Sequence, residues 1–161
     1  MPLPIKIEHR IGVQTTAAAI WPMIVDVTGW PVWNPLYPKA EGEIRFEGRL
    51  TLEVALPGER PRLIRPIVTD WTPNEQIIWT TTAHGGLLRT TRYIEIETLT
   101  DEGVGVIFSN GEIFEGHAVR LIDRRQRARI KAGFAAFGEA VRERAEAEWR
   151  RSGGGAISGA A

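Results

Sequence analysis

The fold follows from AVRLIDRRQRARIKAGFAAFGEAVRERAEAEWR, the stretch from Ala118 to Arg150 near the end of the chain. Apolar side chains recur there at three- and four-residue steps, which places them on one stripe of a helix. At about 1.5 Å per residue this helix would be about 45 Å long, so its stripe needs a large apolar surface to cover it. The stripe comprises Val119, Ile122, Ile130, Phe134, Phe137, Val141 and Ala145.

The chain before this helix alternates apolar and polar residues, the pattern of half-buried strands. The alternation is clearest between Ile5 and Val13, and turn residues separate the later runs. Links of hairpin length between the runs indicate an antiparallel sheet. We predict seven strands, at residues 5–13, 44–46, 50–56, 63–71, 76–83, 87–99 and 104–115.

Two short helices are expected after the first strand. Thr15 or Thr16 would cap the first, through residues 17–21, and Pro22 would kink or shorten it. Residues 28–35 form the second helix or a tight turn. The order of strand, two helices, six strands and long helix predicts an α+β fold, a seven-stranded antiparallel sheet curved around the C-terminal helix. We expect one domain over residues 1–150 and a flexible glycine-rich tail over 151–161.

Composition narrows the classes of function. The 20 basic and 20 acidic residues cancel, so no overall field favours nucleic acid. The absence of cysteine excludes disulfides and thiolate metal sites. His9, His84 and His117 lack metal-ligand spacing, and no phosphate loop or dinucleotide fingerprint occurs, so no metal and no cofactor are predicted. With no signal peptide and no apolar run of membrane-spanning length, we expect a cytoplasmic protein without an integral membrane segment.

Charged side chains fall on the inward faces of the last two predicted strands. Phe108 and Phe114 share a face with Asn110 and Glu112, and Ile94 shares one with Arg92. A buried charge needs a partner, so Arg92 is expected to pair with Glu112. The pair is either a structural ion pair or the polar floor of an apolar pocket, where it would orient a ligand's hydroxyl or carboxylate.

Other side chains allow two interpretations each. Trp30 and Trp33 lie in an irregular segment, where aromatic rings often form a cavity rim, whereas Trp79 is expected in the core. His9 is either a core residue bonded to backbone or a candidate base. The arginines between Arg120 and Lys131 are either the solvated side of the helix or a surface for an anionic partner.

Several motifs together resemble the START-like, helix-grip proteins, in particular the bacterial SRPBCC group labelled polyketide cyclase or dehydrase. The resemblance extends from Ile5 to Glu148. It implies a sheet wrapped on the C-terminal helix with a cavity between them, in a family that binds lipids, hormones or polyketides and of which only some members are enzymes. Arg89–Tyr93 and Ser109–Gly111 depart from the pattern, since relatives often place histidines there. The matching motifs are Trp21, WPVWNP at 30–35, QIIW at 76–79, EIFEG at 112–116, GFAAF at 133–137 and AVRERAE at 140–146.

Three functions follow as hypotheses. The first is binding of a small hydrophobic molecule, aromatic or polyketide-like, by a monomer or homodimer. The second is an aromatase/cyclase-type enzyme, in which Glu112 or His9 is the base and Arg92 stabilises an enolate. The third is an interaction module similar to the chaperone-activator branch of the fold. The expected ligand contacts are the polar residues Arg92, Asn110 and Glu112 and the apolar residues Trp30, Trp33, Leu52, Val54, Trp79, Ile94, Phe108, Phe134, Phe137 and Val141.

Overall fold

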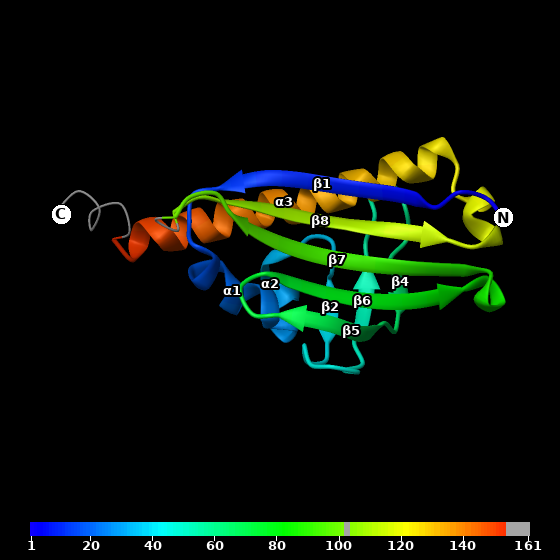
Figure 1. The fold of residues 1–161 in the computed structure, drawn as a ribbon, viewed down its shortest axis with the longest axis horizontal. Coiled ribbons are helices and arrows are strands. Elements are labelled where there is room, and N and C mark those ends of the chain that lie inside the picture. Colours follow the sequence, from blue (N-terminus) through cyan, green and yellow to red (C-terminus); the bar gives the residue numbers. More distant parts are fainter. Residues whose placement is uncertain (102–103, 154–161) are drawn as a thin grey trace.

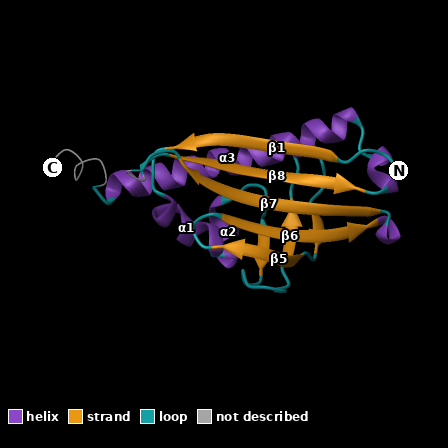
Figure 2. Ribbon diagram, in the orientation of Figure 1, coloured by secondary structure: helices purple, strands orange, loops and turns teal. Residues whose placement is uncertain are grey.

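A computed structural model describes residues 1–101 and 104–153. A twisted antiparallel sheet of five strands lies over a long helix, and a smaller three-stranded sheet lies beside them (Figures 1 and 2). The larger sheet has the order β1-β8-β7-β6-β5 and the smaller one β2-β3-β4. The strands are β1 (Ile5–Val13), β2 (Lys39–Glu41), β3 (Thr51–Val54), β4 (Arg62–Ile64), β5 (Ile67–Thr72), β6 (Gln76–Ala83), β7 (Leu88–Thr98) and β8 (Val106–Glu115).

The long helix, α3 (Arg124–Arg151), packs lengthwise against β1 and β8 (Figure 1). It begins six residues later than expected, because the chain first forms a 3₁₀ turn, η3 (His117–Leu121), and Ile122 is extended. The side chain of Asp123 then accepts a hydrogen bond from the backbone N–H of Gln126 and fixes the start of the helix. The predicted apolar stripe is buried along its whole length, with Phe134, Phe137 and Val141 at most 3% exposed.

The expectation of one seven-stranded sheet is wrong. Residues 44–46 are not a strand, and the neighbouring Lys39–Glu41 pairs with β3 instead. The predicted strand over 63–71 is divided between β4 and β5 at Pro66, which has no N–H to donate to a ladder. A single bridge between Arg49 and Ile67 still connects the two sheets, so the chain bends rather than separates there.

The short helices close one end of the layer between the sheets. Thr16 caps α1 (Ala17–Val25) by accepting from the N–H of Ala19, and the helix continues beyond Pro22 to Val25 instead of ending there. A 3₁₀ turn, η1 (Val27–Gly29), leads into α2 (Trp30–Trp33). Trp30 is fully buried and its indole donates to the carbonyl of Ile24, which ties α2 to α1.

Two expectations from the sequence, a flexible C-terminal tail and the lack of an integral membrane segment, can be compared with the described residues. Most of the predicted tail, residues 154–161, lies outside the described residues. Of the helices within residues 1–101 and 104–153, none has the length and apolarity of a transmembrane span.

Candidate functional site

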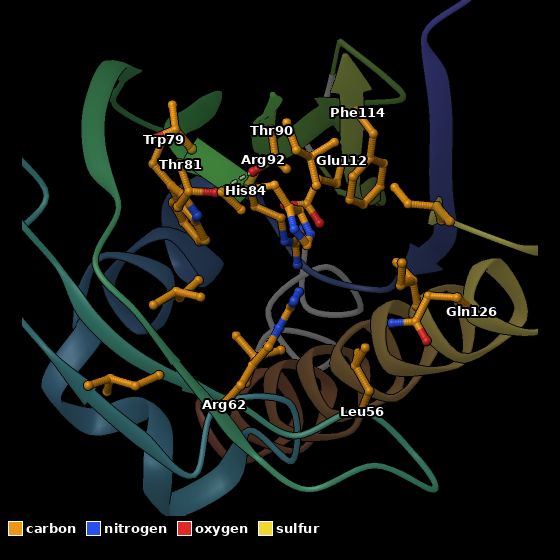
Figure 3. Close-up of a pocket in the computed structure, with 18 of the residues that line it drawn as sticks. Leu56, Arg62, Trp79, Thr81, His84, Thr90, Arg92, Glu112, Phe114 and Gln126 are labelled. Carbon is orange, nitrogen blue, oxygen red and sulfur yellow. Dashed lines mark hydrogen bonds between the residues drawn. The ribbon is translucent and has the colours of Figure 1, made fainter. Parts of the chain in front are cut away.

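A cavity of about 640 Å³ lies between the larger sheet, the smaller sheet and helix α3 (Figure 3). Strands β6, β7 and β8 form one wall, and the start of α3 with η3 forms another. The third wall is β4 with the residues around β3. Apolar side chains such as Leu36, Leu56, Ile130 and Phe134 cover much of the lining. The cavity therefore presents both apolar and polar surface to a bound molecule.

Arg92, on β7, contributes a cation to the inner end of this cavity although it is only 2% exposed. Its Nε donates to the hydroxyl of Tyr37 at 3.2 Å, and its Nη2 donates to Oδ1 of Asn110 at 2.8 Å. Its Nη1 donates to the backbone carbonyls of Tyr93 and Gly111 at 3.0 and 3.1 Å. These four bonds leave one of the five guanidinium N–H groups, on Nη2, without a partner among the described residues.

Aromatic rings surround the same guanidinium. The Phe134 ring centroid lies 4.1 Å from the Arg92 Cζ atom, and the rings of Trp79 and Phe137 lie at 5.7 and 5.8 Å. Ring faces carry partial negative charge and attract cations, more strongly where water is excluded. Neutral oxygens and aromatic rings therefore stabilise the buried Arg92.

The predicted ion pair between Arg92 and Glu112 is wrong. The two residues lie opposite each other in the β7–β8 register, as their inward faces required. However, no guanidinium nitrogen of Arg92 comes within 4 Å of the Glu112 carboxylate. Tyr37, Asn110 and two backbone carbonyls instead take four of the five donors of Arg92 and fix the position of its guanidinium.

Glu112 lines the cavity and is half-buried, with its exposed part facing the cavity rather than bulk solvent. Burial raises the pKa of its carboxyl above the usual 4.5, and this effect outweighs the lowering by the charge of Arg92, a hydrogen bond with Thr90 and the charge of Arg62. The hydroxyl of Thr90 is also hydrogen-bonded to that of Thr81, 2.5 Å away. The Thr90 hydroxyl thus contacts the carboxyl group of Glu112, and the Thr81 hydroxyl supports Thr90 from the neighbouring strand.

Two residues of the cavity had no signal in the sequence analysis. Tyr37 is 2% exposed, and among the described residues its hydroxyl accepts from Arg92 and donates to no protein group, so its proton can be donated into the cavity. Arg62 projects from β4 toward the end of the cavity that holds Arg92 and Glu112 (Figure 3). Tyr37 follows an irregular proline-rich segment and Arg62 follows a turn, so neither belongs to a periodic pattern that would have indicated its direction.

The predicted ligand contacts fall into three groups. Val54, Trp79, Arg92, Glu112 and Phe134 line the cavity. Trp33 lies instead on a separate surface groove of about 360 Å³ beside Arg144. The others are buried behind the cavity wall, as core or supporting residues: Trp30, Leu52, Ile94, Phe108, Asn110, Phe137 and Val141.

His9, the other predicted base, does not line the cavity. It faces Gly138 of α3, and a Cβ atom at that glycine would lie 2.8 Å from its Nδ1. This Nδ1 is buried and has no hydrogen-bond partner among the described residues, so the backbone bond expected for a core histidine is not seen there. Burial lowers the pKa of His9, with Glu139 opposing and Lys131 adding to the effect. The structure thus brings Glu112 and Arg92 to the cavity and leaves His9 under the helix.

Asn110 supports the cavity from behind. It is fully buried, accepts from Arg92 and donates from Nδ2 to the backbone carbonyl of Phe134 at 3.1 Å. The ring of Phe134 in turn covers the Arg92 guanidinium. One amide therefore connects the cation of the cavity to the turn of α3 that forms the opposite wall.

No family model matches the chain, and neither does any curated protein. Solved structures do. The Zhui aromatase/cyclase from Streptomyces sp. R1128 superposes with a TM-score of 0.75 at 17% identity, over 94% of this chain and 99% of that one. A START superfamily protein from Mycobacterium smegmatis gives 0.70 at 16% identity, over 88% and 97%. Norcoclaurine synthase from Thalictrum flavum gives 0.65 at 14%, over 88% and 92%. The chain therefore has the START-like, helix-grip fold, as its motifs indicated.

Proposed function

We propose that the protein binds a small, mostly apolar molecule that places an oxygen-bearing head group at the inner end of the cavity. The observation that carries this proposal is a cavity of about 640 Å³ with many apolar lining residues, at whose inner end Arg62, Arg92 and Glu112 lie together. Ligand pockets commonly have volumes of about 300–1,000 Å³ and combine apolar walls with a few polar groups that fix orientation. A ligand cavity also favours this function over an interaction module that works through its surface alone.

The polar end defines the head group. Arg62, the remaining N–H of Arg92 and the Tyr37 hydroxyl can all donate hydrogen bonds. Glu112, when protonated, adds a fourth donor and otherwise accepts. A carbonyl, phenolate or carboxylate oxygen matches this set, whereas an ammonium group would face two arginines. We therefore expect neutral or anionic heads to be preferred over cationic ones.

Binding can be tested with two hydrophobic dyes, a neutral one and an anionic one, whose fluorescence changes when they bind. Metabolites extracted from cells are then tested for their ability to displace the bound dyes. Leu56→Trp fills the cavity and should abolish binding of both dyes. Leu99→Trp adds the same ring at an exposed position outside the cavity lining and serves as the control. Unchanged dye affinity in Leu56→Trp, with the fold retained, would exclude this cavity as the binding site.

Arg62→Gln tests the orientation of the head group. Arg62 is solvent-accessible along its side chain and makes no ion pair among the described residues, so its loss should leave the fold intact. We expect weaker binding of the anionic dye and little change for the neutral dye. Equal loss of both would place the head group elsewhere in the cavity.

A second candidate function is proton abstraction beside a carbonyl group. It is favoured by one observation, a carboxyl of raised pKa that faces the same cavity as Tyr37 and Arg92. In its ionised form Glu112 would remove a proton from the carbon next to the carbonyl. The C–H electron pair would then move to the carbonyl oxygen as an enolate, which Tyr37 and Arg62 would stabilise by hydrogen bonds. Among the proteins of this fold, the neighbours named as aromatase/cyclases and a synthase show that enzymes occur on it.

One experiment distinguishes ligand binding alone from proton abstraction. Exchange of the central protons of a simple aromatic 1,3-diketone for deuterium is followed by NMR, with and without the protein. An enzyme should accelerate exchange, and Glu112→Gln should abolish the acceleration while dye binding remains. If the unaltered protein binds the dyes but does not accelerate deuterium exchange, only the binding function is supported.

A further inference from the structure

The cavity opens at one end of the molecule. Its exposed lining residues include Leu63 on β4, His84 at the end of β6, in the 3₁₀ turn η2 (His84–Gly86), and Leu121 in η3. Figure 1 shows the N-terminus, the turn after β6 and the turn after β8 together at this same end. The mouth of the cavity is therefore built from strand β4, two turns and a chain terminus.

Four large apolar side chains are exposed around this mouth. Leu3, Leu63, Leu87 and Leu121 are 84%, 51%, 54% and 66% exposed. A single exposed leucine needs no explanation, but four gathered on one end of a protein are a candidate contact surface.

Backbone pairing and the cavity lining bring the segments that carry these leucines to the same end of the molecule. In the β1–β8 register Ile5 lies opposite Phe114, so the start of β1, two residues after Leu3, lies beside the end of β8. The carbonyl of Leu87 accepts a hydrogen bond from the N–H of Ala118, inside η3, at 3.0 Å. Leu121 ends η3, and it lines the same cavity as Leu63.

Positive charge accompanies these leucines. The segments at the mouth, residues 63–65, 84–89 and 115–124, carry four arginines but only two carboxylates, Glu115 and Asp123. Because the whole chain has no net charge, this excess is local to one end. Asp123 is moreover engaged as the cap of α3. The four arginines are Arg65, Arg89, Arg120 and Arg124.

We propose that this end docks on an anionic lipid surface, with the leucines in the interface and the arginines at the lipid phosphates. Apolar side chains that insert together with nearby basic residues are the combination by which proteins attach to the surface of anionic membranes. Leu3, Leu87 and Leu121 lie outside the strands and Leu63 lies on β4, so no single groove or continuous strand presents them, which suits a deformable surface better than a protein partner. Docking would point the cavity mouth at the bilayer. It depends on the surface alone and not on what the cavity binds.

The test is flotation of the full chain with vesicles of phosphatidylcholine alone and of phosphatidylcholine with phosphatidylglycerol. We expect binding to the anionic vesicles that weakens with added salt, and at least about tenfold weaker binding to the neutral ones. Leu3→Ser with Leu87→Ser should reduce anionic-vesicle binding by a similar factor. The matched control is Val32→Ser with Leu99→Ser, which removes two equally exposed side chains away from the mouth.

A second pair of variants tests how much the arginines contribute to vesicle binding. Arg120→Glu with Arg124→Glu should abolish vesicle binding, whereas Arg142→Glu with Arg150→Glu, farther along α3, should leave it unchanged. None of these residues lines the cavity, so dye binding reports the cavity independently in every variant.

Three outcomes would overturn the proposal. The first is no flotation of the unaltered protein with anionic vesicles. The second is equal flotation of the Leu3/Leu87 variant and its control, which would reduce the effect to nonspecific charge attraction. The third is concentration-dependent self-association that the Leu3/Leu87 variant abolishes, because the leucines would then cover a second copy of the chain.

Discussion

Replacing Asn110 with leucine tests whether a single amide links the cavity's cation to helix α3. Asn110 is fully buried between the larger sheet and the helix. Its side chain accepts from Arg92 at 2.8 Å and donates to the carbonyl of Phe134 at 3.1 Å. Leucine has a similar size but can make neither bond, so the guanidinium N–H and the carbonyl would both remain buried without this partner.

The expected loss follows from those two bonds. A hydrogen bond to a charged group contributes about 1.5–3 kcal/mol and a neutral one about 0.5–1.5 kcal/mol, and leaving buried partners unsatisfied keeps the loss near the upper end. The better burial of leucine offsets part of it. We expect Asn110→Leu to lower the free energy of unfolding by about 3 kcal/mol, or roughly 10 °C in melting temperature for a domain of this size.

Urea unfolding followed by tryptophan fluorescence measures the change, and a double-mutant cycle with Arg92→Met isolates the link. The double variant replaces both partners by apolar groups, so it should cost at least about 1 kcal/mol less than the sum of the single variants. Ser109→Ala, on the opposite face of β8, controls for general disturbance of the strand. A cost below about 1 kcal/mol for Asn110→Leu, or a strictly additive cycle, would refute the reasoning.

Two further predictions concern titration and packing. Because burial raises the pKa of Glu112, the native state keeps a proton that the unfolded state releases, so the stability of the unaltered protein should fall as pH rises from about 4.5 through that raised pKa. Glu112→Gln should lack this slope and be at least as stable at neutral pH, and equal urea midpoints against pH in both proteins would contradict the raised pKa. Gly138→Ala should cost about 1–3 kcal/mol, because its Cβ would lie 2.8 Å from His9 Nδ1. His9→Ala in the same chain should recover part of that loss, and no recovery would show that the contact is not the cause.

Periodic patterns predicted the parts of the fold that repeat. The stripe of α3 and the inward faces of β7 and β8 are as the sequence indicated, including Arg92 and Glu112 on facing positions. Contacts between distant segments could not be predicted in this way. Tyr37 is 55 positions from Arg92, and it takes the donor that the sequence analysis had assigned to Glu112.

Irregular segments limited the prediction in a second way. The proline-rich stretch around α2 has no period to show which side of it faces the core, so Trp30 was expected at a rim and is fully buried. Likewise, the run over 63–71 alternates like one strand, and only the missing N–H of Pro66 accounts for its division between two sheets.

The buried charge of Arg92, which only uncharged groups contact, affects the ionisation of any molecule that binds in the cavity. No carboxylate of the described residues lies within 4 Å of the Arg92 guanidinium, so no ion pair neutralises its positive charge at the inner end of the cavity. A phenol or 1,3-diketone that reached this end would lose its proton more readily than it does in water, because the resulting anion would be stabilised there. The positive charge would thus lower the pKa of the bound group, and a phenolic dye would report this directly by the absorption of its anion at a pH where the free dye is still neutral.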